Sequence, residues 1–135
     1  MNKSVGNDCG YMSVAFVKDS DMMALPSRQV TVTGYPGAGI SLGFYDEETN
    51  SSTTLEGIMY SSRGYVTRCS GREILYNVDT GTGTDGAALV CTQRGNSDEI
   101  LAGINVASGS GANTFNIGVH IENTHMKWLQ SLGIR

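Results

Sequence analysis

Two aspartates and three glycines share one short stretch near the middle of the chain. It reads Asp-Thr-Gly-Thr-Gly-Thr-Asp-Gly from Asp79 to Gly86, and its second aspartate is Asp85. A glycine-rich loop either turns the backbone sharply or presents N–H groups to a ligand. Two carboxylates held close together can serve as a general acid and base. The stretch is therefore the candidate site, and its surroundings must decide which chemistry it supports.

The spacing of the aspartates and cysteines in the sequence does not by itself indicate a catalytic or a metal-binding site. Asp79 and Asp85 are six residues apart across a glycine turn, so the sequence does not define a carboxylate pair. They do not follow the calcium-binding EF-hand pattern. The three cysteines, Cys9, Cys69 and Cys91, match no metal-ligand spacing and allow at most one internal disulfide. We expect them to be small buried hydrophobic residues, and we expect neither a metal nor a cofactor.

The string from Gly81 to Gly86 also reads as GxGxxG, the pattern of a dinucleotide-binding loop. That loop needs a strand before it and a long helix after it. The apolar run 74–78 supplies the strand, but the run 87–91 is followed at once by a polar turn. The sequence therefore argues against a dinucleotide site.

The rest of the chain is a succession of short, strand-like runs separated by turn residues. Residues 22–26 are expected to form a loop or strand edge, and residues 46–53 a polar hairpin tip. The expected strands cover residues 11–17, 29–33, 41–45, 64–69, 73–78, 87–91, 100–106 and 114–121, and residues 54–60 lead into another. This pattern predicts an all-β fold, a small antiparallel barrel or sandwich.

The last residues differ from the rest. Met126, Leu129 and Leu132 fall at helical spacing, Asn123 is a plausible N-cap, and Gly133 is a good stop. We therefore predict a single C-terminal helix after the strands.

Composition limits the classes of function. The chain has 135 residues, enough for one domain, with 18 glycines and 16% charged residues. Its net charge is −4 and its basic residues are scattered, so we expect no nucleic-acid partner. No apolar stretch is long enough for a membrane span, and the first residues lack the apolar segment of a signal peptide. A complete chain would then be cytoplasmic, whereas a fragment of a secreted protein stays open.

Five segments, in order, resemble one protein family. Residues 30–37 (VTVTGYPG) are similar to the family pattern "TVTGYPG", and Met59 with residues 64–67 (GYVT) is similar to "M…GxIT". Tyr76, Thr80 and residues 83–89 (GTDGAAL) are similar to "Y…T…GNSGSPV". Residues 103–105 (GIN) are similar to "GIH", and residues 115–121 (FNIGVHI) are similar to "FNGAVFI". These patterns belong to the chymotrypsin/trypsin-like serine proteases, in particular the bacterial glutamyl-endopeptidase (V8-like) branch. The resemblance implies the second, six-stranded antiparallel β-barrel of that fold at residues 28–122. Residues 1–27 would be the remnant of the inter-barrel segment with a first strand, and residues 123–135 the closing helix.

The resemblance also implies site residues. Asp85 occupies the nucleophile position, and Gly83 and Asp85 would supply the oxyanion-hole N–H groups. Asp8 matches the segment that carries the triad aspartate, although a turn residue before a strand explains it equally well. Thr80 and Asn105 match positions of the specificity pocket.

Three departures from the family set the expected function. Asp85 stands where the family has serine; an aspartate cannot play the serine's part, and its charge opposes an oxyanion. The triad histidine belongs to a first barrel that we expect to be absent, and His120 and His125, which follow Asp85, are expected to be structural or surface residues. Asn105 replaces the histidine that recognises glutamate, so glutamate specificity is not implied.

We therefore expect a serine protease homologue, a second-barrel half that is inactive as it stands and takes a peptide or protein in its residual cleft. Two alternatives stay open: half of a serine endopeptidase completed by the missing first barrel, or a non-enzymatic interaction or assembly module. Under each of these hypotheses, an exposed apolar face of the chain would bind either the missing first barrel or a second copy of the chain.

Overall fold

The chain forms a β-barrel with short helices at two positions. The computed structural model describes residues 12–35, 41–46, 51–54, 59–80, 83–95, 97–107 and 115–133, and for 41–46 and 51–54 only the backbone. The elements are β1 (Ser13–Val14), α2 (Asp19–Met22), β2 (Gln29–Gly34), β3 (Ser41–Asp46), β4 (Ser51–Thr54), β5 (Tyr60–Ser70), β6 (Glu73–Tyr76), β7 (Ala88–Thr92), β8 (Glu99–Ala107), β9 (Asn116–His120) and α3 (Asn123–Ser131).

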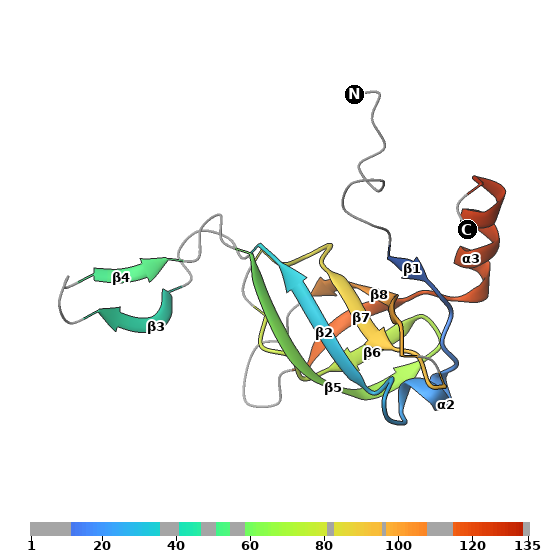
Figure 1. Cartoon of the computed structure of the whole chain (residues 1–135), viewed down its shortest axis with the longest axis horizontal. Coiled ribbons are helices and arrows are strands. Elements are labelled where there is room, and N and C mark those ends of the chain that lie inside the picture. The colour runs from blue at the N-terminus through green and yellow to red at the C-terminus, as the bar shows by residue number, and fades with distance from the viewer. Residues whose placement is uncertain are drawn as a thin grey trace.

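Six of these strands close into an antiparallel barrel, as the sequence predicted. The strands follow the order β8-β7-β2-β5-β6-β9, and the pairing of β9 with the second half of β8 completes the circle (Figure 1). An extra strand, β1, runs parallel to the beginning of β8. β3 and β4 pair with each other in a separate two-stranded sheet.

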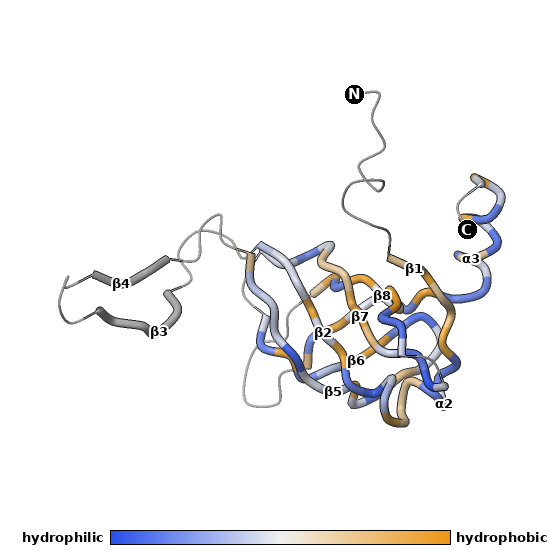
Figure 2. The backbone as a smooth tube through the Cα atoms, in the orientation of Figure 1, coloured by the Kyte–Doolittle hydropathy of each residue, from blue (hydrophilic) through white to orange (hydrophobic). Residues whose placement is uncertain are grey.

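Alternating side chains explain why these segments fold as strands. In β2 the buried residues are Val30 and Val32, and in β6 they are Ile74 and Tyr76. Their period of two directs one face of each strand into the barrel. Val66, Leu89 and other apolar residues complete a continuous core with them. In Figure 2 hydrophobic colour lies on parts of the barrel strands and beside α2, and hydrophilic colour lies on several of the outer turns.

The C-terminal helix forms where it was predicted, but its cap differs. Glu122, not Asn123, is the N-cap of α3, and the backbone N–H of Glu122 donates to Nδ1 of His125 at 3.0 Å. Such a side-chain bond satisfies an N–H group that would otherwise be left without a partner at the start of a helix. α3 buries none of its residues, and Figure 1 shows it set apart from the barrel strands. No helix in the described part of the chain is long and apolar enough to cross a membrane.

Several predicted boundaries are wrong. Of residues 12–17, the described part of the expected strand at 11–17, only Ser13–Val14 form a strand, and Asp19 begins a helical turn, α2, that ends at Met22. This turn forms because Met22 is fully buried in the core, which local polarity does not reveal. The polar residues at 46 and 51–53 belong to the paired strands β3 and β4, so the expected hairpin tip shortens. The runs 54–60 and 64–69 were expected to be separate, but Tyr60–Ser70 is one strand.

Candidate functional site

The stretch from Asp79 to Gly86 lies between β6 and β7, and its described part is a tight turn. Gly83 has φ 90° and Gly86 has φ 85°, values in the left-handed region that favours glycine. The backbone N–H of Ala87, just after Gly86, donates to the carbonyl of Thr84 at 3.0 Å. The two glycines therefore hold Asp85 at the tip of a defined turn, where it is exposed.

Asn105, on β8, supports this turn from below. It is fully buried, and its side-chain Nδ2 donates to the carbonyl of Thr84 at 3.0 Å. Its backbone carbonyl accepts from the N–H of Gly86, and its own N–H donates to the carbonyl of Ala87, both at 2.8 Å. Three bonds from one residue thus fix both sides of Asp85, so the shape of the turn depends on Asn105.

Tyr76, on β6, extends the same network. Its hydroxyl donates to Oδ1 of Asn105 inside the barrel. Burial raises the pKa of Tyr76, and the negative charge of Asp85 raises it further. The phenol therefore keeps its proton across the physiological pH range and acts as a donor to Asn105.

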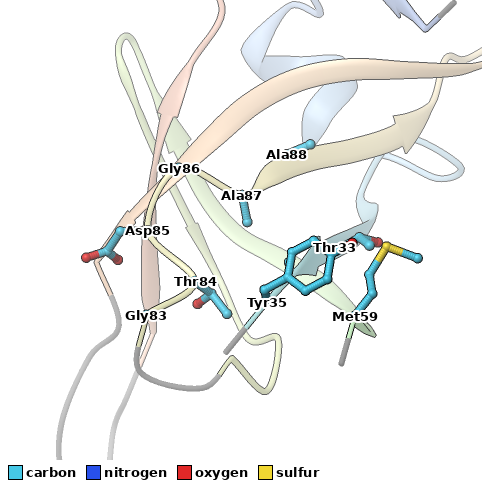
Figure 3. A pocket seen from close by; sticks show the side chains of 10 residues that line it. Thr33, Tyr35, Met59, Gly83, Thr84, Asp85, Gly86, Ala87 and Ala88 are labelled. Carbon is cyan, nitrogen blue, oxygen red and sulfur yellow. The ribbon is translucent and has the colours of Figure 1, made fainter. Parts of the chain in front are cut away.

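A hollow of about 360 Å³ lies beside the turn. Its wall is formed by residues 83–88 together with the end of β2, Tyr35 and Met59. Tyr35 and Met59 are each 61% exposed, which gives the hollow an apolar rim. Figure 3 shows the Asp85 carboxylate on the other side of the turn, pointing away from Tyr35 and Met59. The site thus has an apolar end and an acidic end.

The structure brings together part of the site that the sequence predicted. Gly83 and Asp85 line the hollow, whereas Asn105 lies beneath the turn and outside the lining. Thr80 is half-buried and is not among the residues of the wall. Asp8 lies outside the described residues. The roles assigned to these five residues stay predictions.

Other residues of the site were not singled out as functional. Tyr35 and Met59 appeared only as landmarks of the family resemblance, and Thr84 is buried at the centre of the turn. A Cβ on Gly34 would lie 3.2 Å from Cβ of Ala87, so β2 approaches the turn closely at that point. The sequence feature that could have marked Tyr35 as a site residue is its position next to Gly34, at the end of a strand in which buried and less buried residues alternate.

The chemistry available to this wall is limited. Its described residues include no serine, cysteine or histidine, so the hydroxyls of Thr33 and Thr84 have no imidazole base beside them in that wall. The backbone hydrogen bonds within the described chain do not use the N–H groups of Gly83 and Asp85. The site offers backbone donors, one carboxylate and an apolar rim, which is a set suited to binding.

Comparison with known proteins adds no family assignment, because no protein-family model matches the chain and no curated protein matches it significantly.

Proposed function

We propose that this chain is a non-catalytic homologue of the trypsin-like serine proteases that binds an extended peptide segment at the turn around Asp85. The observation that carries the proposal is the turn itself. Two left-handed glycines and three hydrogen bonds from Asn105 hold it in shape, although its tip carries a carboxylate. A rigid turn costs little ordering when a ligand binds.

The two ends of the site suggest the chemistry of the ligand. An extended segment laid across the turn meets Tyr35 and Met59 at one end and Asp85 at the other. Apolar side chains suit the first end, since they remove exposed aromatic and thioether surface from water. A lysine or arginine suits the second end, because it pairs with the carboxylate. We therefore infer a peptide with a basic residue a few positions from an apolar one.

Binding can be measured with fluorescently labelled peptides that hold one arginine and one leucine at varied separation. We expect saturable binding that Asp85→Asn weakens about fivefold to tenfold, the effect of losing about 1 kcal/mol from a partly exposed ion pair. Asp79→Asn is the matched control, because Asp79 is an exposed carboxylate outside the hollow, and it should bind as the parent does. Equal affinities for the parent and Asp85→Asn would refute the assigned role of the carboxylate.

The endopeptidase alternative rests on the same turn and has a separate test. If the chain is half of a protease, Asp85→Ser restores the nucleophile position without changing the glycines on either side. Release of dye from quenched peptide substrates by Asp85→Ser, added to a histidine-bearing first barrel of this family, would favour the alternative. If the two barrels form a complex and still cleave nothing, the alternative fails and the binding function stands.

A further inference from the structure

Three side chains that can bind metals meet at a place separate from the hollow. Asp19 begins α2, Cys69 lies near the end of β5, and His120 is the last residue of β9. Nδ1 of His120 lies 3.6 Å from Sγ of Cys69 and 3.5 Å from Oδ1 of Asp19. Sγ of Cys69 lies 3.5 Å from the same oxygen. The three atoms form a nearly equilateral triangle.

The side chains are held in place by their surroundings. His120 is fully buried and its ring packs against Phe16, with ring centroids 5.7 Å apart. Asp19 uses its other oxygen, Oδ2, to accept the backbone N–H of Gly71 at 3.0 Å. One carboxylate oxygen is thereby fixed by the β5–β6 turn, and the other is directed at the cluster. Such outer hydrogen bonds are typical of side chains that bind metals.

A catalytic triad is the first alternative, and the geometry argues against it. In a triad the histidine uses one ring nitrogen for the nucleophile and the other for the carboxylate. Here Cys69 and Asp19 both approach Nδ1 of His120. Burial raises the pKa of the Cys69 thiol to about 12, and the charge of Asp19 contributes, so the sulfur is not a nucleophile at neutral pH.

Convergence on a single point is instead the arrangement that a shared cation requires. Zinc bonds of about 2.3 Å to sulfur and about 2.0–2.2 Å to nitrogen and oxygen, at tetrahedral angles, put the ligand atoms roughly 3.3–3.6 Å apart. The three distances in the cluster are 3.6, 3.5 and 3.5 Å. We propose that Asp19, Cys69 and His120 form a binding site for a zinc-class divalent cation.

The cluster borders solvent on the Asp19 side, because that side chain is 45% exposed whereas His120 is fully buried. Asp19 and Gly71 also line an open hollow of about 440 Å³, whose wall includes Lys18 and Glu122. With three protein ligands, we expect a water molecule from the Asp19 side to be the fourth, exchangeable ligand. The hollow shares no lining residue with the one beside Asp85, so the metal site is independent of the proposed peptide binding.

Metal binding must rearrange protons in the cluster. Without metal, Nδ1 of His120 can donate to the carbonyl of Gly71 at 3.0 Å, and the Cys69 thiol can donate to Asp19. When the metal binds, the Cys69 thiol releases its proton to solvent, and the imidazole proton of His120 moves from Nδ1 to Nε2. Sγ of Cys69 and Nδ1 of His120 then each present a lone pair to the metal. The metal then links three segments about 50 residues apart and should stabilise the folded chain.

Cobalt(II) is the probe of choice, because a thiolate ligand gives it a charge-transfer band and tetrahedral geometry gives it intense visible bands. The protein for this test carries Cys9→Ser and Cys91→Ser, so that Cys69 is the sole thiol. We expect one equivalent of cobalt to give both features and one equivalent of zinc to remove them. We also expect zinc at a hundredfold excess over its dissociation constant to raise the free energy of unfolding, because a folded-state ligand in that excess shifts the folding equilibrium about a hundredfold.

Variants distinguish this site from adventitious binding. Cys69→Ser should abolish the charge-transfer band, and Asp19→Asn, which can still accept the Gly71 N–H, should weaken binding at least tenfold. His125→Gln is the control, since His125 serves α3 instead, and it should leave the spectrum unchanged. If cobalt gives no thiolate band in the single-cysteine protein, or the band survives Cys69→Ser, the cluster is only a hydrogen-bonded group and the proposal is wrong.

Discussion

Asn105 is the residue on which the candidate site depends most. It occupies a position that the family resemblance assigns to substrate recognition, yet each of its polar side-chain atoms is engaged inside the protein, with Tyr76 and Thr84. Asn105 can still influence recognition, but through the shape of the turn and not through direct contact. Its removal should therefore affect stability and peptide binding together.

We predict that Asn105→Ala lowers the free energy of unfolding by about 2 kcal/mol, because it leaves the buried Tyr76 hydroxyl without its acceptor and removes the side-chain bond to the Thr84 carbonyl. Urea denaturation followed by circular dichroism measures the change. Asn123→Ala is the control at an exposed position, and it should stay within about 0.5 kcal/mol of the parent. A similar result for both variants would show that the turn does not need Asn105.

Cys91 gives a prediction for alkaline pH. Burial raises the pKa of this thiol from 9.0 to about 11, so the folded chain keeps the proton longer than the unfolded chain does. The stabilisation is complete below pH 9 and is lost as pH rises through about 11. We expect the unfolding free energy to fall over this range and to fall less steeply in Cys91→Ala. Tyr76 and Cys69, whose pKa values are also raised, should account for the remaining slope. Parallel pH profiles for the two proteins would contradict the prediction.

At the scale of elements, the sequence predicted what depends on local pattern. The alternation of Val30 and Val32 placed β2, and the helical spacing from Met126 placed α3. The sequence pattern did not predict α2, because that turn forms through the burial of Met22 against strands that are distant in the sequence. The cluster of Cys69 and His120 with Asp19 was invisible for a related reason, since barrel closure brings together residues that no sequence spacing connects.

Gly64 lies on β5 where that strand passes very close to Asn77, and it gives a sharp test of the packing. A Cβ on Gly64 would lie 2.1 Å from the backbone carbonyl oxygen of Asn77, the residue that follows the neighbouring strand β6. Neither backbone can move without breaking the pairing. We predict that Gly64→Ala destabilises the fold by about 3 kcal/mol or more, as overpacked sites do.

Gly86→Ala is the matched comparison for Gly64→Ala. Gly86 has φ 85° but no atom within 4 Å of its added Cβ, so only the left-handed backbone is strained. Its expected cost is about 1–2 kcal/mol. Thermal unfolding of both variants tests the order, and a Gly64→Ala protein as stable as Gly86→Ala would show that β5 and β6 are farther apart than described.

For the whole molecule, the barrel separates two kinds of chemistry. The β6–β7 turn presents a carboxylate and an apolar rim, whereas the cluster at Cys69 joins the end of β5 to α2 and β9. The proposed metal site at Cys69 would act on stability, and the proposed binding site at the β6–β7 turn would act on recognition. Loss of metal should therefore lower stability while leaving the shape of the Asp85 turn, which Asn105 holds, unchanged.

The exposed rim also predicts how copies of the chain behave together. Tyr35 and Met59 are both 61% exposed next to one hollow, and an apolar rim of this kind favours contact with a second copy or with a first barrel. We predict reversible dimerisation in sedimentation experiments at increasing protein concentration, and a monomer for Met59→Lys. Leu25→Lys, at a residue that is 66% exposed but outside the hollow, should still dimerise. Since a bound peptide covers the same rim, a peptide that binds at Asp85 should dissociate the dimer. If the parent protein stays monomeric at high concentration, the predicted self-association is wrong, and only the proposed peptide binding is left as a role for the rim.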